Sequence, residues 1–169
     1  IFARNSQTID VIPWARGALI AEGSIEVSAS LTDDRRTYIA IGGYAMNGCS
    51  MKLLEFLELK GGVRVVPAQG IAARAVGRIS AEGNIAGFGG GYNFWIEISG
   101  GLGWNPVALE SRLEIGGVVW IEARGRRLSL GASLVSELYL QKPLIFRMKV
   151  NFEIKIPFAK LRIPVTIFD

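Results

Sequence analysis

Strict alternation of apolar and polar residues runs through most of this chain and limits what it can fold into. In the segment from Leu144 to Ile156 every second residue is apolar, and Arg147, Lys149, Glu153 and Lys155 stand between the apolar residues. Successive side chains of a β-strand point to opposite faces of the sheet. The pattern therefore predicts a strand with one apolar face and one polar face.

The same alternation recurs along the chain in the segments Leu19–Leu31, Ile71–Gly87, Tyr92–Trp104, Val107–Arg124, Leu128–Leu140 and Pro157–Phe168. Turn-forming pairs that suit chain reversals are Gly100-Gly101, Asn105-Pro106, Gly125-Arg126 and Lys142-Pro143. Short connections of this kind favour antiparallel neighbours. We therefore expect an all-β antiparallel meander of eight or nine long amphipathic strands, which forms a strongly curved sheet, a closed barrel or a sandwich.

One segment favours a short helix. Ser50 to Gly62 begins with a potential N-cap serine, continues with helix-forming residues and ends at a glycine pair. The same residues also fit a strand, so both interpretations stay open at this point. No linker or change of composition divides the 169 residues. We expect residues 1–169 to form a single β domain that is a fragment or module of a larger protein or assembly.

The chain contains no histidine and one cysteine, Cys49. This composition excludes a Ser-His-Asp triad, a Cys-His pair, the usual zinc sites and an internal disulfide. We accordingly expect no catalytic residue, no metal site and no cofactor. An enzyme is the third-ranked function here, since it would have to use carboxylate or tyrosine chemistry.

The apolar face needs a cover, because a soluble monomer rarely exposes an apolar patch larger than a few hundred Å². The leading hypothesis is a non-enzymatic structural or binding module whose apolar concave face holds lipid or packs on another chain or on the rest of its own protein. The alternative is a membrane-embedded β-barrel, whose strands need only about ten alternating residues. The residues predicted to bind lipid or another apolar surface are Leu113, Ile115, Leu130, Leu134, Phe146, Met148, Val150, Phe152 and Ile154.

The polar face supplies two further sets of candidates. Trp95, Trp120 and Tyr139 are predicted to dock a partner, since aromatic residues with a polar group are enriched at interfaces. Residues 124–169 contain nine Lys or Arg against three Asp or Glu, which is typical of an ordinary solvated face and would also suit contact with an anionic surface. The contact residues would be Arg147, Lys149, Lys155, Lys160 and Arg162. Specific nucleic-acid binding is not expected, because the aromatic residues of this region fall on the apolar side.

Two resemblances accompany these patterns. The segment "FEIKIPFAKLRIPVTI", Phe152 to Ile167, is similar to the amphipathic β-sheet regions of large lipid transfer proteins of the vitellogenin and apolipoprotein B type. The segments "WNPVALESRLEIGG", Trp104 to Gly117, and "LSLGASLVSELYLQKP", Leu128 to Pro143, resemble a β-rich module of large uncharacterised bacterial proteins. The first resemblance implies a sheet that holds lipid, and the second implies a β module without a defined activity. Neither resemblance implies a catalytic residue. The location is left open, with an extracellular or cell-envelope location favoured, and an oligomer or a larger assembly is one possible setting for the chain.

Overall fold

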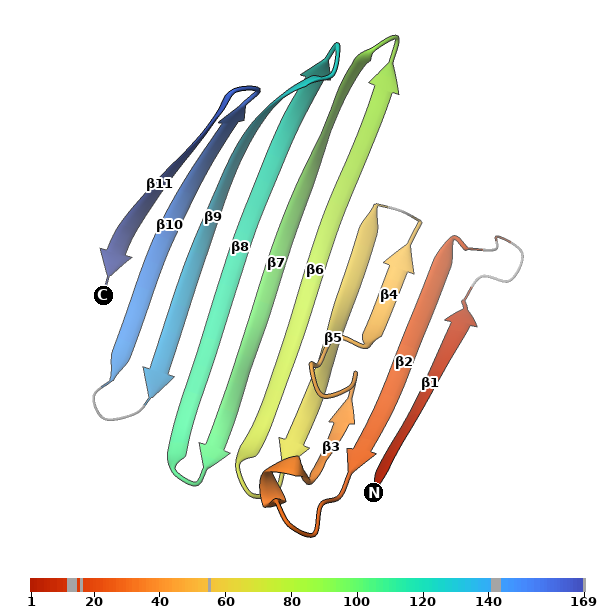
Figure 1. The fold of residues 1–169 in the computed structure, drawn as a ribbon, viewed down its shortest axis with the longest axis vertical. Coiled ribbons are helices and arrows are strands. Elements are labelled where there is room, and N and C mark those ends of the chain that lie inside the picture. The colour runs from red at the N-terminus through yellow and green to blue at the C-terminus, as the bar shows by residue number, and fades with distance from the viewer. Residues whose placement is uncertain (12–14, 16, 55, 141–143, 169) are drawn as a thin grey trace.

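The structure, a computed structural model, describes residues 1–11, 15, 17–54, 56–140 and 144–168. These residues form one antiparallel sheet of eleven strands and a single 3-10 turn, η1 (Asp34–Arg36) (Figure 1). The all-β prediction is therefore confirmed. The strands are β1 (Phe2–Asp10), β2 (Leu19–Ser28), β3 (Tyr38–Ile41), β4 (Cys49–Leu53), β5 (Leu57–Val66), β6 (Gly70–Ile85), β7 (Phe88–Trp104), β8 (Val107–Ala123), β9 (Arg126–Leu140), β10 (Ile145–Ile156) and β11 (Ala159–Phe168).

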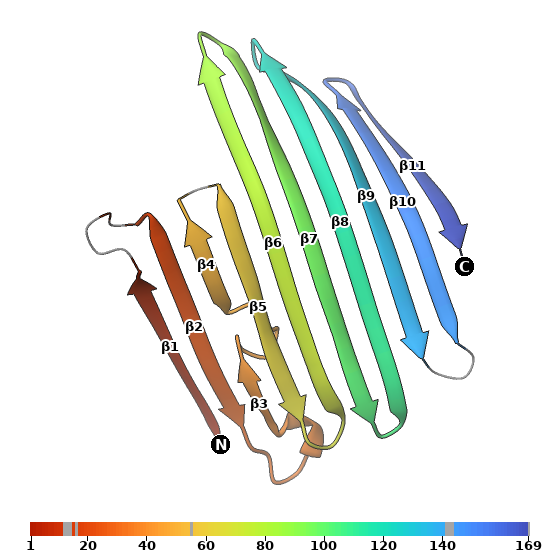
Figure 2. The ribbon, with the colours of Figure 1, turned by 180° about the vertical axis from the view of Figure 1, so that it is seen from behind.

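The sheet is a meander with one interruption. Strands β3 and β4 both lie between β2 and β5, one after the other along their length (Figure 2). The helix considered for Ser50–Gly62 is wrong, because residues 50–53 of this segment lie in β4 and residues 57–62 lie in β5. Pairing in the sheet places Met51 opposite Leu59. Both apolar side chains thereby gain a neighbour on the same face, which an isolated short helix would not supply.

The four central strands are long, and their reversals are tight. The reversal predicted at Gly100-Gly101 is wrong, because both glycines lie inside β7 and pair with β6 and β8. The reversal at Asn105-Pro106 is confirmed, and the one predicted at Gly125-Arg126 falls one residue earlier, at Arg124-Gly125. These two residues have φ of 51° and 72°, as a two-residue hairpin turn that matches strand twist requires. The predicted Lys142-Pro143 reversal lies outside the described residues.

The sheet is a single layer. Among the described residues only two apolar side chains are buried, Ala40 and Val66. The accessible surface is 11720 Å², whereas a compact monomer of 18.3 kDa would expose about 8,100 Å². Most stable domains pack two layers around a core. In this single-layer sheet, the surface that a second layer would cover is exposed.

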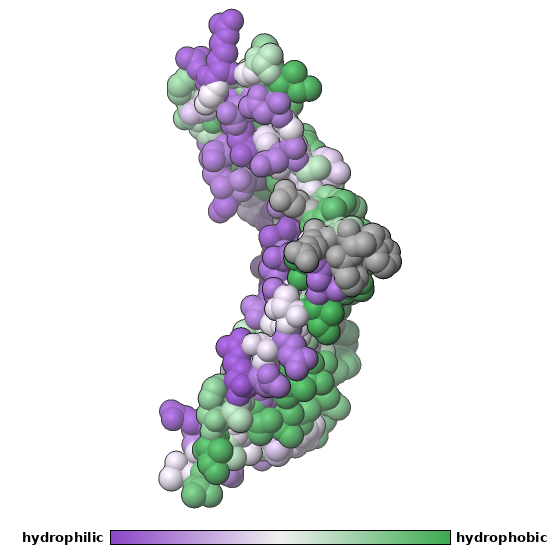
Figure 3. Space-filling model, turned by 90° about the vertical axis from the view of Figure 1, so that its right-hand side faces the viewer, coloured by the Kyte–Doolittle hydropathy of each residue, from purple (hydrophilic) through white to green (hydrophobic). Residues whose placement is uncertain are grey.

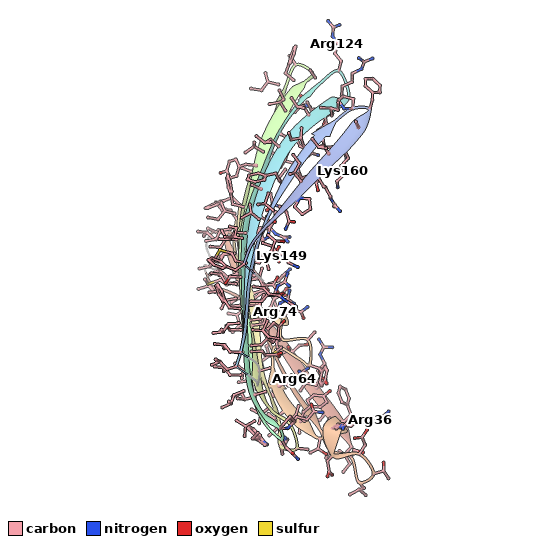
Figure 4. The ribbon with its side chains drawn as sticks, turned by 90° about the vertical axis from the view of Figure 1, so that its left-hand side faces the viewer. Arg36, Arg64, Arg74, Arg124, Lys149 and Lys160 are labelled. Carbon is pink, nitrogen blue, oxygen red and sulfur yellow. The ribbon has the colours of Figure 1, made fainter. Side chains whose placement is uncertain are left out.

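The sheet bends along its long axis, and its two faces differ in character. Figure 3 shows hydrophilic residues along the hollow side of the bend and hydrophobic residues along the outer side. Figure 4 shows Arg64, Arg74 and Lys149 on the hollow side. The expectation of a concave apolar face is therefore wrong. Apolar side chains such as Ile96, Ile115 and Leu134 lie on the convex side. The concave side carries the ion pairs of the sheet, together with Trp95 and Trp120.

Candidate binding surfaces

The convex side is a continuous apolar face, formed by the odd-numbered residues of β6 and the residues level with them on the other strands. One row across the sheet shows its character: Leu59, Gly77, Ile96, Ile115, Leu134 and Val150 lie opposite one another in turn. Within the described strands, the pairing register places only one charged side chain on this face, Arg126 at the start of β9. Its guanidinium lies 5.6 Å from the ring centre of Phe158. The face therefore offers a partner almost no charge to desolvate.

The structure brings all the predicted apolar-face residues together on this side. Val150 lies opposite Leu134, which lies opposite Ile115. The full set, Leu113, Ile115, Leu130, Leu134, Phe146, Met148, Val150, Phe152 and Ile154, occupies the adjacent strands β8, β9 and β10. Their shared side confirms the predicted sidedness, and what they bind stays a prediction.

The apolar face is hollowed near its centre. Small residues of neighbouring strands lie there, including Gly61, Ala73, Ala75 and Gly100, and they leave a shallow hollow of about 770 Å³. Larger side chains such as Ile98 stand beside it. The sequence interpretation missed this feature, because the small residues become neighbours only through the strand register. Such a hollow can receive an apolar side chain or an alkyl chain.

The concave side is a charged face, formed by the even-numbered residues of β6 and the residues level with them. Glu97 and Glu114 lie directly opposite each other on β7 and β8. Arg74 Nε donates to Glu97 at 2.9 Å, and Arg112 donates to Glu114 at 2.8 Å and to Glu137 at 2.7 Å. The arginines thus offset the repulsion of the facing carboxylates.

Hydrogen bonds lower the pKa values of two carboxylates on the charged face, Glu114 and Glu153. The pKa of Glu114 lies below its usual value because Arg112 donates to it, and the Trp95 indole N–H, at 3.2 Å, acts in the same direction. The pKa of Glu153 is lowered by hydrogen bonds from Lys160 and Arg162, at 2.8 and 2.9 Å. Hydrogen bonds from neighbouring groups therefore favour the ionised forms of Glu114 and Glu153.

The predicted anionic-surface residues gather on two neighbouring strands of the charged face. Arg147, Lys149 and Lys155 lie on β10, and Lys160 and Arg162 lie on β11. Lys155 and Lys160 face each other directly, which like charges do only at some cost. An anion at this corner would relieve that repulsion, so contact with an anionic surface stays a prediction.

Two of the three predicted docking aromatics cover glycines on the neighbouring strand. A Cβ atom added to Gly116 would lie 2.3 Å from Trp95 Cζ2, and one added to Gly91 would lie 2.4 Å from Trp120 Cζ2. The guanidinium of Arg127 lies 4.2 Å from the Trp120 ring centre. These contacts give both tryptophans a role within the sheet, and their contact with a partner stays a prediction.

Tyr139 lies apart from the two tryptophans. It borders a hollow of about 350 Å³ on the charged face, whose floor includes Gly70, Ala72 and Gly101. Glu110 lies opposite Tyr139 and also borders this hollow. The three predicted docking residues therefore share a face but form no single cluster.

A buried carboxylate on β2 was not anticipated from the sequence. Glu26 is 7% exposed and accepts a hydrogen bond from the Tyr38 hydroxyl. This hydrogen bond and burial raise the pKa of Tyr38 to about 12. Tyr44 packs edge-on against Tyr38 at 4.8 Å, and Arg64 stacks on Tyr44 at 4.1 Å. Because four different segments supply these side chains, alternation along any one segment gave no signal for the cluster.

Among the described residues, no group of three or more His, Cys, Asp or Glu is placed to hold a metal ion. The described part of the chain also contains no helix that is long and apolar enough to cross a membrane. Comparison with known proteins gave no matching family model, no similar curated protein and no similar solved structure.

Proposed function

We propose that this chain is a non-enzymatic structural module that binds through its convex apolar face, and that an apolar layer of adjoining protein covers this face. The adjoining layer would belong to another chain or to another part of the same protein. The observation that carries this proposal is the nearly charge-free face of a single-layer sheet.

The exposed area supports a cover of considerable size. The surface exceeds that of a compact monomer by about 3,600 Å², from 11720 Å² measured and about 8,100 Å² expected. Obligate protein interfaces bury about 2,000–5,000 Å² in total and are rich in apolar residues. Stacked sheets pack about 10 Å apart through side chains of this kind. A second layer of protein would therefore complete an ordinary two-layer fold.

Site-specific photo-crosslinking tests which face is covered and by what. We would place p-benzoylphenylalanine at Ile98, which is 53% exposed on the apolar face, and at Ser99 as a matched control. Ser99 is the next residue of β7, and its side chain lies on the charged face. We expect polypeptide adducts at position 98 and few at position 99. Equal adducts at both positions would contradict the proposal.

Lipid is the second candidate cover, and the hollow over Gly61, Ala73 and Gly100 favours it. Its volume of about 770 Å³ falls within the range of about 300–1,000 Å³ for small-molecule sites. A fatty acid or phospholipid retained at fixed stoichiometry in a detergent-free preparation, measured by native mass spectrometry, would support this candidate. Ala73→Phe should then remove the lipid by filling the hollow, whereas Ala72→Phe, on the charged face, should not.

A further inference from the structure

The sheet ends in two open edges. Within the described residues, β1 pairs only with β2, and β11 pairs only with β10. We propose that copies of this chain join edge to edge, with β11 of one copy pairing antiparallel to β1 of the next, so that their sheets become continuous. An unpaired edge presents a row of backbone donors and acceptors that a further strand can use.

The directions and lengths of the two edge strands fit this arrangement. Ten strands lie along the path from β1 to β11, and each runs antiparallel to its neighbour. The two edge strands therefore run in opposite directions (Figure 1), and a second copy in the same orientation places its β1 antiparallel to β11. The strands have nine and ten residues, so they overlap almost completely.

The hydrogen-bonding pattern shows which backbone groups face outward. The Ala29 N–H donates to the Ile1 carbonyl and the Val11 N–H donates to the Leu19 carbonyl, both at 2.9 Å. The odd-numbered residues of β1 thus bond to β2, and the backbone groups of its even-numbered residues face the open edge. In β11, Pro164 lies opposite Asn151. Since proline has no N–H, its nitrogen faces away from β10, and so do the backbone groups of Lys160, Arg162 and Thr166. The open edge therefore lacks a donor at Pro164, and a register shift ends this alternation before Phe168.

Because even-numbered residues face outward at both edges, the apolar and charged faces of one copy match those of the next. The side chains of the outward-facing residues lie on the charged face at both edges, as Arg4 opposite Glu26 and Arg162 opposite Glu153 illustrate. Residues that face each other in an antiparallel pair place their side chains on the same side. Joined copies would therefore have one continuous apolar face and one continuous charged face. If odd-numbered residues faced outward at one of the two edges, the apolar face of one copy would continue into the charged face of the next.

The two edges also carry opposite charge. On the charged face, β1 and β2 have one cation and three anions, which are Arg4, Asp10, Glu22 and Glu26. Strands β10 and β11 have five cations and one anion, which are Arg147, Lys149, Lys155, Lys160, Arg162 and Glu153. Full overlap of the edge strands places Asp10 opposite Lys160. Pairing of β11 with a second β11 would instead juxtapose two basic edges and two prolines, which disfavours a closed dimer through that edge.

Zero-length carbodiimide crosslinking tests the contact directly. Within one chain Asp10 and Lys160 lie at opposite edges of the sheet, about 43 Å apart at about 4.8 Å per strand. An Asp10–Lys160 amide can therefore form only between copies. In a mixture of ¹⁴N- and ¹⁵N-labelled protein we expect this crosslink in mixed-isotope peptides. The Glu153–Lys160 pair, 2.8 Å apart, is the internal control, and its crosslink without the Asp10–Lys160 crosslink would overturn the proposal.

Two edge-blocking variants test the head-to-tail geometry, with a non-ionic detergent covering the apolar face. Ser6→Pro removes an outward N–H from β1, and Arg162→Pro removes one from β11. In sedimentation velocity each folded variant alone should lose at least tenfold in association constant. Their mixture should form dimers, because each retains the edge that the other lacks. Ser6→Ala, which keeps the N–H, should associate as the unmodified chain does.

Three results of the same experiment would overturn the proposal. Dimers of Arg162→Pro alone would indicate pairing between two β1 strands. Unchanged association of both variants would indicate a contact that does not use the strand edges. A purely monomeric unmodified chain at every concentration would show that the edges do not pair. Circular dichroism of each variant confirms that its sheet is intact.

Discussion

Replacing Gly116 by alanine should destabilise the sheet although alanine favours strands more than glycine does. Gly116 is buried beneath Trp95, and an added Cβ would lie 2.3–2.9 Å from three atoms of the indole. Moving the indole also breaks its 3.2 Å hydrogen bond to Glu114. Overpacking costs about 1–3 kcal/mol and the lost hydrogen bond about 0.5–1.5 kcal/mol. The gain in strand propensity offsets about 0.5–1 kcal/mol, so the expected net loss is about 0.5–4 kcal/mol.

Gly83→Ala is the matched control for this substitution. Gly83 also lies within a long central strand, but no atom lies within 4 Å of an added Cβ. The replacement should therefore stabilise the sheet by about 0.5–1 kcal/mol. Urea unfolding followed by circular dichroism measures both changes. If Gly116→Ala were as stabilising as Gly83→Ala, the packing of Trp95 on Gly116 would be refuted. In the Trp95→Ala background the cost of Gly116→Ala should disappear.

Three further predictions concern the charged face and the sidedness of the sheet. Tyr38→Phe removes the hydroxyl that donates to a buried carboxylate, Glu26, and should lower the free energy of unfolding by about 1–3 kcal/mol. A change below experimental error would show that the hydrogen bond is not formed in solution. The pKa of Glu114 is lowered in the folded state, so the stability that Glu114 contributes is complete above the usual carboxyl pKa and is lost as the pH falls through the pKa of the folded state. Glu114→Gln should therefore flatten the acid side of the plot of unfolding free energy against pH. An unchanged plot would contradict this. Phe152→Lys places a charge on the apolar face and should abolish binding of the covering layer. Lys149→Glu, on the charged face, should change the free energy of unfolding by less than about 1 kcal/mol. If the two substitutions had equal effects on binding and on unfolding, the assignment of the two faces would be wrong.

The amino-acid sequence by itself determined the strands and their two faces. Alternation has a period of two residues only in a strand, so the segment from Val107 to Phe168 allowed a direct prediction of β8 to β11 and of their apolar side. Turn chemistry located reversals such as Asn105-Pro106. These features depend on neighbours in the chain, and local patterns are sufficient to predict them.

Only the tertiary structure decided how the strands are placed against one another. Gly100-Gly101 looks like a turn locally, but pairing on both sides keeps it extended within β7. The Trp95–Gly116 contact, the Glu26–Tyr38 cluster and the hollow over Ala73 each join residues from different strands. The convex position of the apolar face is likewise evident only from the bend of the whole sheet. Strand register and curvature are collective properties, because each strand's position depends on the side chains of its neighbours.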